Sequence, residues 1–513
     1  QCGTCADDEV CQGTPSTCQP DLSCPNLCQN QETCTPGTET SISGKVYAPN
    51  GLQALNNALV YVPNIPDLDD LPAISSGVDT SSAQCERCED EDLGQPLVAA
   101  LTGPDGAFTL SNVPAGVSFP LVVKMGKWRR VTMIPAVAAC SSNVLAVDDA
   151  RLPRSRTDAP AADLIQHVNI PKMAVVTGKV DAIECVLRKI GVADSEFSRS
   201  TGDGRIHLYE GINGATQVRN TQGVAETTEI YTTLFSGGTP RINNYDMTVL
   251  DCEGGEKTAH RVSGQRSPLY AYANAGGRVF ASHYSYTYLD DRPPQGSSTV
   301  VGNFYTTATW RGPQNTEANP TTGIIDVSHG KGQAFNEWLT NEGALHPTHG
   351  DGYIGIIDPR QYVVEPTADI TERFVYTEAG HIPPGASSSV NVTDSVQQFS
   401  FGTPIGADQD SVCGRVLYSA FHVAGTNLDT DNKIFPDGYC SSDPLTAQEK
   451  ILEFMLFDLS ACVTPFLPPT CGFVTVSEPP TRCSRLFGQS RNTTSVIGRS
   501  GVNTTRSWPV TTR

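Results

Sequence analysis

Short apolar runs separated by turn residues fill the part of the chain between residues 41 and 148. Strong turn sequences at 103–106 and 112–116 interrupt these runs, because glycine, proline, asparagine and aspartate favour tight turns. The runs have the length and the β-branched or aromatic content of strands, and they lie at 41–47, 58–62, 107–110, 121–124 and 131–134. This pattern predicts a small antiparallel β-sandwich over residues 41–148.

After a linker at 149–170, rich in arginine, proline and alanine, buried strands alternate with helices. The strand candidates lie at 172–178, 205–209, 245–252 and 276–283, and the helix candidates at 182–190 and 268–274. The capping box formed by Thr446 and Glu449 opens a last helix that ends at Leu459. Strands separated by helices predict a parallel sheet, and therefore a flavodoxin-like α/β domain over residues 171–465.

Three further segments complete the predicted organisation. Residues of about 290–410 mix glycine, proline and threonine with short strands and one helix at 334–343, so we expect a β-rich insertion at one rim of the sheet. Residues 1–40 are polar and cysteine-rich without hydrophobic periodicity, and such a segment depends on crosslinks. The tail at 466–513 is rich in threonine, serine and arginine. The fold class is therefore multi-domain α/β plus β, with an extended C-terminal tail.

The cysteine content indicates an oxidising compartment. The odd total of seventeen leaves at least one thiol free or paired with another chain, and we expect disulfides among these residues: Cys2, Cys5, Cys11, Cys18, Cys24, Cys28, Cys34, Cys85, Cys88, Cys140, Cys185, Cys252, Cys413, Cys440, Cys462, Cys471 and Cys483. Zinc is the alternative at Cys2/Cys5 and Cys85/Cys88, but no histidine lies near either pair. The chain begins at Gln1 and not at a methionine, which predicts a secreted chain whose signal peptide has been removed. No apolar run is long enough to span a membrane, so we expect no membrane span. The sequence leaves open whether the chain carries a lipid anchor.

The net charge of −20 argues against nucleic acid as a partner. The tail from residue 466 holds six arginines and a single acid, Glu478, so it carries about +5 against about −25 for the body. We therefore expect the tail to pack on another copy of the chain, giving a homo-oligomer or filament, with a flexible or folded-back tail as the alternative.

Two stretches resemble known families. The first stretch resembles the carboxypeptidase regulatory-like domain, a transthyretin-like sandwich. The segments that carry this resemblance are "SGKVYAPNG", "ALVYVPN", "TGPDGAFTLSNVPAG" and "FPLVVKMGKWRR". The second stretch resembles the ThuA-like branch of the class I glutamine amidotransferase-like fold. The segments that carry this resemblance are "YDMTVLDCEGGE", "AYANAGGRVFASHYS" and "CGRVLYSAFHV". Residues 40–465 together resemble a bacterial secreted family that fuses the two domains. This resemblance implies an architecture and no particular activity.

A class I amidotransferase needs a nucleophilic cysteine on the sharp turn after a central strand, activated by a later histidine. Here that turn contains Ser282 and His283 and no cysteine. Ser282 with His422 could form a substitute pair, and a buried polar strand tip is the alternative. The sequence therefore favours a protein that is not an enzyme.

Other polar residues are candidates for binding. His422 and the rim residues Asp251, Glu253, Glu256 and His283 could converge at the carboxyl edge of the sheet and hold a divalent metal or a sugar, or be satisfied rim groups. Cys252 also ends a strand there, and we expect a disulfide between Cys185 and Cys252 in preference to a reactive thiol.

One loop is rich in oxygen ligands. Asp429, Asp431 and Asp437 lie close together in the sequence "NLDTDNKIFPDG", which resembles a calcium loop without being an EF-hand, and a solvated turn is the alternative. We therefore expect no cofactor, with calcium as the possible exception.

Taken together, the patterns predict a secreted or cell-surface structural and interaction protein that assembles with itself or with other surface components. The alternative is a carbohydrate-binding or carbohydrate-processing protein that uses the rim of the α/β sheet.

Overall fold

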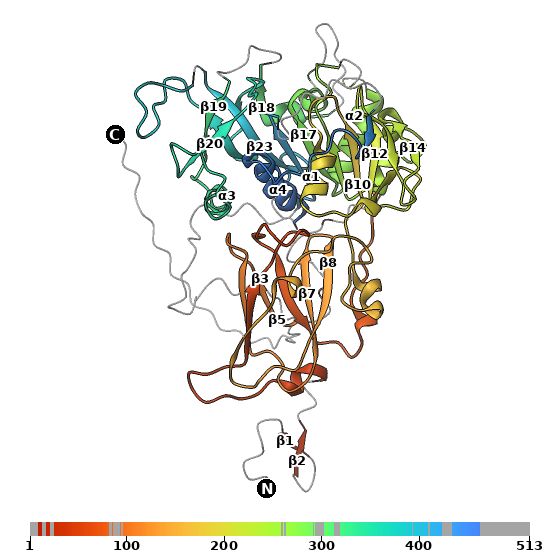
Figure 1. Cartoon of the computed structure of the whole chain (residues 1–513), viewed down its shortest axis with the longest axis vertical. Helices are drawn as coiled ribbons and strands as arrows, with labels where there is room; N and C mark the ends of the chain where they lie inside the picture. The colour runs from red at the N-terminus through yellow and green to blue at the C-terminus, as the bar shows by residue number, and fades with distance from the viewer. Residues whose placement is uncertain are drawn as a thin grey trace, which may run out of the picture. The chain divides into compact units, whose positions relative to one another are not determined.

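The structure, a computed structural model, describes most of the chain up to residue 461 (Figure 1). The described residues are 9–12, 17–20, 25–81, 85, 93, 96–257, 260, 263–290, 292, 302–311, 319–391, 393–408, 411–422 and 433–461. They form a mixed α/β protein with many sheets and few helices, as the sequence predicts. Near the N-terminus, β1 (Glu9–Gln12) and β2 (Thr17–Pro20) pair as an antiparallel hairpin.

Residues 41–144 contain two sheets that share one core. The first has the order β6 (Ala107–Ser111), β3 (Ser41–Lys45), β9 (Ser142–Val144). The second has the order β5 (Pro96–Leu101), β4 (Leu59–Pro63), β7 (Phe119–Met125), β8 (Trp128–Ile134). Alternation along β4 sends Val60 and Val62 into the main core beside Ile42, whereas Tyr61 joins a separate cluster. Only the β3–β9 pair is parallel among these pairings.

The α/β part is built on a parallel sheet that reverses its winding direction. Six strands follow one another in space: β11 (Phe197–Arg199), β12 (Ile206–Glu210), β10 (Met173–Thr177), β16 (Met247–Leu250), β17 (Arg278–Ser282) and β24 (Gly414–Ser419). All are parallel. Numbered along the chain, the five from β12 to β24 have the order 2-1-3-4-5, so the switch point lies between β10 and β16, where doubly wound folds place ligands.

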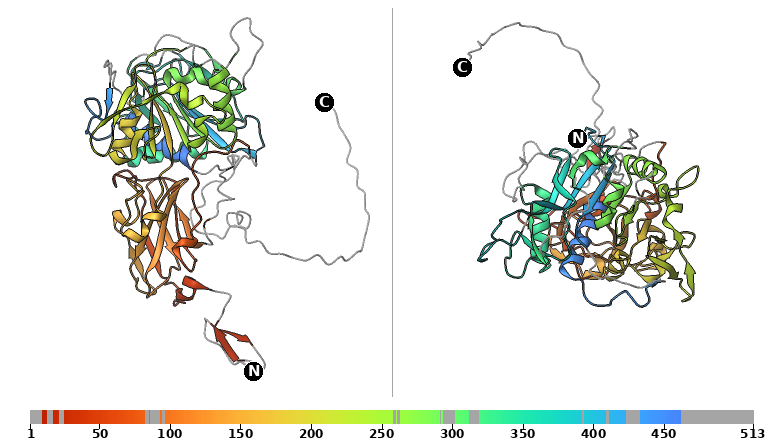
Figure 2. Two further views of the ribbon diagram at one scale, coloured as in Figure 1. Left: turned by 90° about the vertical axis from the view of Figure 1, so that its right-hand side faces the viewer. Right: turned by 90° about the horizontal axis from the view of Figure 1, so that it is seen from above.

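Helices cover both faces of this sheet. Val175 of β10 packs in one cluster with α1 (Ile183–Lys189), α3 (Gly330–Asn341) and α4 (Ala447–Ser460). Its neighbour Val176 packs on the opposite face with α2 (Ser263–Asn274). Figures 1 and 2 show α4, in blue, on the face opposite α2. The predicted capping box of α4 is confirmed, since Thr446 accepts from the Glu449 amide and Glu449 accepts from the Thr446 amide.

The sequence predicts a β-rich insertion at one rim of the sheet. The inserted strands instead pair with the sheet and extend it. Beyond β24 the sheet continues through antiparallel strands β23 (Ser395–Thr403), β22 (Thr371–Thr377), β19 (Thr321–Ile325) and β20 (Tyr353–Ile356). Two smaller sheets lie outside it: β18 (Ala308–Trp310) with β21 (Val363–Pro366), and β14 (Ala225–Thr227) with β13 (Ala215–Arg219) and β25 (Lys433–Phe435). A further short strand, β15 (Glu229–Ile230), pairs with β12.

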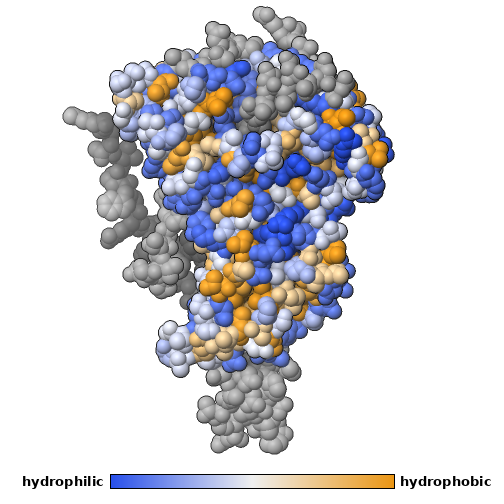
Figure 3. All heavy atoms as spheres, in the orientation of Figure 1, coloured by the Kyte–Doolittle hydropathy of each residue, from blue (hydrophilic) through white to orange (hydrophobic). Residues whose placement is uncertain are grey.

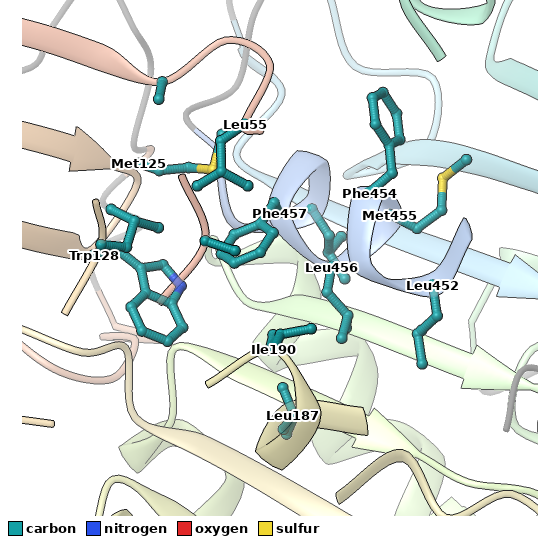
Figure 4. Close-up of a cluster of buried hydrophobic side chains, with 14 of the residues drawn as sticks. Leu55, Met125, Trp128, Leu187, Ile190, Leu452, Phe454, Met455, Leu456 and Phe457 are labelled. Atoms are coloured by element: carbon teal, nitrogen blue, oxygen red, sulfur yellow. The ribbon is translucent and has the colours of Figure 1, made fainter. Parts of the chain in front are cut away.

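The sandwich and the α/β part share one hydrophobic core. The rings of Trp128 in β8 and Phe457 in α4 lie 5.9 Å apart, and Met125 lies beside them (Figure 4). The indole of Trp338 in α3 donates to the carbonyl of Ala54 at 2.6 Å. Since this burial is continuous, the sandwich stabilises the helical face of the sheet.

Three disulfides link described residues: Cys34–Cys140, Cys85–Cys413 and Cys185–Cys440. The predicted Cys185–Cys252 disulfide is wrong. Cys185 lies on α1 against the segment that precedes α4, which brings its Cα within 5.2 Å of that of Cys440, whereas Cys252 is buried and unpaired at a strand end. Cys28 is also disulfide-bonded. The side chains of the other predicted disulfide cysteines lie outside the described residues: Cys2, Cys5, Cys11, Cys18, Cys24, Cys88, Cys462, Cys471 and Cys483.

The tail from residue 462 lies outside the described residues as well. No helix among those described is long and apolar enough to cross a bilayer. Hydrophobic residues gather on the part of the surface in Figure 3 that the sandwich forms. Exposed apolar side chains of the sandwich include Leu101, 54% exposed, and Val144, 81% exposed.

Candidate functional site

The candidate site lies at the carboxyl edge of the sheet, where four neighbouring strands end. Asp181 follows β10, Cys252 follows β16, His283 follows β17, and His422 follows β24. Parallel pairing in register places these ends at one edge, next to the switch point. The sequence predicted this convergence for the two histidines, but not for Asp181.

The sharp turn after β17 is centred on His283. Its φ of +48° lies in the left-handed region, which is unfavourable for a residue with a Cβ atom. The Tyr418 hydroxyl donates to the carbonyl of His283 at 2.9 Å and fixes this turn. An imidazole therefore occupies the tip of the turn after β17.

The sulfur of the site comes from the neighbouring strand. Cys252 Sγ lies 3.2 Å from Nδ1 of His283, and the backbone amides of Gly254, at 3.4 Å, and Tyr284 donate to it. Burial, with the charge of Asp181, nevertheless raises the pKa of the Cys252 thiol. Burial, reinforced by His422 and Arg360, lowers the pKa of His283 well below its usual value. The contact is therefore between a protonated thiol and a neutral imidazole.

The second imidazole lies beside a carboxylate. The rings of His283 and His422 stack with centroids 4.0 Å apart and planes at 22°. His422 Nδ1 lies 3.2 Å from one oxygen of Asp181, and the hydroxyl of Ser282 donates to the other oxygen. Ser282 and His422, which the sequence suggested as a substitute catalytic pair, are thus joined through Asp181, which accepts a hydrogen bond from the Ser282 hydroxyl.

The acidic residues Asp251 and Glu253, which were predicted to line the rim, lie in buried environments of their own. Asp251 is buried, and burial with the charges of Glu184 and Asp181 raises its pKa well above the usual value. Glu253 is buried as well, with Oε2 3.0 Å from Nε2 of His260 and Oε1 accepting the amide of Ile212.

The remaining predicted ligands do not join the cluster. Glu256 is exposed. Of the calcium candidates, Asp437 is exposed and forms an ion pair with Arg219, while Asp429 and Asp431 lie outside the described residues.

One member of this site, Asp181, has no prediction from the sequence. It follows the glycine turn after the first strand of the sheet. Positions just after parallel strands are the usual places for functional side chains, so this signal could have grouped Asp181 with His283 and His422. Cys252 follows the third strand and was predicted at the same edge, but as the disulfide partner of Cys185.

Comparison with protein-family models found no matching family, and comparison with curated proteins found no matching sequence. Among solved structures, the chain is similar to a ThuA-like protein from Bacteroides uniformis. The identity is 9% and the TM-score 0.30, over 56% of this chain and 92% of the other. A likeness at this level carries no argument about function.

Proposed function

We propose that this protein is a secreted or cell-surface structural and interaction protein, and that its α/β domain, though built like the ThuA and amidotransferase folds, does not hydrolyse glutamine. The observation that supports the proposal most strongly is the identity of the residue at the sharp turn after β17. His283 occupies the turn, and the nearest described sulfur, Cys252, is a buried thiol whose pKa is raised. A thiol in that state is a poor nucleophile.

Burial of the site supports the same proposal. Ser282, Cys252 and His283 are each 0% exposed. Asp251 and Glu253, which a sugar at this rim would have to contact, are 1% and 2% exposed. The geometry therefore favours an interaction protein over a carbohydrate-binding protein at this edge, because recognition of a polar ligand needs accessible hydrogen-bonding groups.

The rest of the chain offers surfaces for association. The Cys85–Cys413 disulfide and the shared core join the sandwich to the sheet, and apolar side chains such as Leu101 are exposed on the sandwich. The tail of about +5 against a body of about −25 adds an attraction between copies that salt weakens. A head-to-tail contact of this kind gives rings or filaments.

Light scattering of the full-length protein and of a variant ending at residue 465 tests the proposal. We expect the full-length chain to form a larger species whose size falls in high salt, and the truncated chain to be monomeric. A matched variant that retains the tail but replaces its six arginines with glutamine separates charge from length. Equal assembly of the full-length and truncated chains would overturn the role of the tail.

A further inference from the structure

We propose that Cys252, His283 and His422 form a binding site for one thiophilic metal ion, copper or zinc. One potential ligand atom from each of these residues lies within 4.8 Å of the others, and all three side chains are buried. The ligands follow the ends of three strands that are neighbours in the sheet, β16, β17 and β24. The sheet therefore brings the three residues together before the ion arrives, and only the imidazole rings must turn.

The spacing of the atoms is close to that of a metal site. With a sulfur ligand at about 2.3 Å and a nitrogen ligand at about 2.0 Å, an ion separates the two ligands by about 3.5–3.8 Å in tetrahedral or trigonal geometry. Cys252 Sγ and His283 Nδ1 are 3.2 Å apart. The His283 and His422 rings stack at 22°, so ligation requires each ring to turn about its Cβ–Cγ bond until a nitrogen lone pair faces the ion.

The surroundings of the three residues are those that metal ligands need. The carboxylate of Asp181 beside His422 Nδ1 favours a proton on that nitrogen and leaves Nε2 to ligate, as in carboxylate–histidine–metal arrangements. Ser282 donates to the same carboxylate. The amides of Gly254 and Tyr284 donate to Sγ and would stabilise a thiolate.

The donor set decides which ion binds. One sulfur and two imidazole nitrogens suit copper and zinc, whereas calcium and magnesium require oxygen ligands. Binding replaces the S–H bond of Cys252 with a sulfur–metal bond and releases the proton to solvent. The thiolate and Asp181 then supply two negative charges near the bound cation, Zn²⁺ or Cu⁺, which limits the cost of burying it.

The experiment uses the full-length protein with its disulfides intact, freed of metal with a chelator and titrated separately with Zn²⁺ and with Cu⁺ against a competing chromophoric ligand. We expect one ion per chain for at least one metal, with release of one proton. Co²⁺ used as a probe should give a sulfur-to-metal charge-transfer band in the near ultraviolet. The metal that binds more tightly identifies the ion.

Matched variants locate the ion. Cys252→Ser should abolish the cobalt band and weaken binding at least 100-fold, and Asp181→Asn should weaken it about 10–100-fold while retaining the band. The surface variant His381→Gln should bind like the native protein. Should Cys252→Ser fail to fold, as judged by circular dichroism, His422→Gln replaces it. Absence of binding to the native protein, or unchanged affinity in the folded ligand variants, overturns the proposal.

Discussion

The sulfur of Cys252 lies 3.2 Å from Nδ1 of His283, across the ends of the adjacent parallel strands β16 and β17. The imidazole of His283 lies at the turn after β17, and the thiol faces it from the neighbouring strand. Burial raises the pKa of the thiol and lowers the pKa of the imidazole, so the cluster is closed and favours the neutral form of both groups.

The first prediction concerns the reactivity of Cys252. Because the thiol is buried and its pKa is raised, iodoacetamide should label it slowly in the native protein at pH 8 and rapidly after unfolding in urea without reductant. Peptide mass spectrometry measures both rates, and Cys252→Ser controls for labelling elsewhere. Equal rates in the native and unfolded protein would contradict the closed site.

The second prediction concerns the turn at His283. Both His283→Gly and His283→Ala remove the ring, but only glycine adopts a φ of +48° without a steric cost. The glycine variant should therefore be more stable than the alanine variant by about 1 kcal/mol, since the left-handed conformation costs about 1–2 kcal/mol and glycine loses more entropy on folding. Urea unfolding measures the difference. An alanine variant as stable as the glycine variant would show that this turn relaxes.

Strands and helix caps could be predicted from the sequence, whereas disulfide pairing could not, for a physical reason. Local patterns placed the strands that become β10, β12, β16 and β17, and the capping box placed α4, because alternation and caps depend on neighbouring residues. The partner of Cys185 is 255 residues away, and no local pattern encodes that distance.

The candidate site was predicted only in part for the same reason. The convergence of His283 and His422 follows from strand ends in a parallel sheet, so it could be predicted. The role of Asp181 depends on the side-chain direction in the loop after β10, and the extension of the sheet by β19, β20, β22 and β23 depends on long-range pairing.

The third prediction concerns Glu453 on α4. Its side chain is 0% exposed, neither carboxyl oxygen has a hydrogen-bond partner among the described residues, and burial with the charge of Glu342 raises its pKa well above the usual value. The folded chain therefore retains a proton that the unfolded chain loses above pH of about 4.3, so this group makes stability fall as pH rises from there toward the folded pKa.

Glu453→Gln should remove that loss. The variant should gain stability relative to the native protein as pH rises from 4 to 8, by about 1–2 kcal/mol. Melting temperatures across this range measure the effect, and Glu337→Gln, on the exposed side of α3, serves as the control. A difference that does not change with pH would mean that Glu453 is ionised in the folded chain.

The fourth prediction concerns the Cys185–Cys440 disulfide, which ties α1 to the segment before α4. Replacing both residues with alanine should lower the stability by about 2–5 kcal/mol, the usual effect of removing a native disulfide. Thermal unfolding measures the loss, and peptide mapping without reductant should find the Cys185 and Cys440 peptides linked. A Cys185 peptide linked to Cys252 would contradict the pairing in the structure.

Ammonia release from glutamine by the full-length protein shows whether the carboxyl edge of the sheet is a closed cluster or a glutaminase site. If the cluster is closed, the rate of ammonia release equals those of the Cys252→Ala and Ser282→Ala variants and of the heat-denatured protein. Ammonia release by the native protein that either substitution abolishes would contradict the closed cluster.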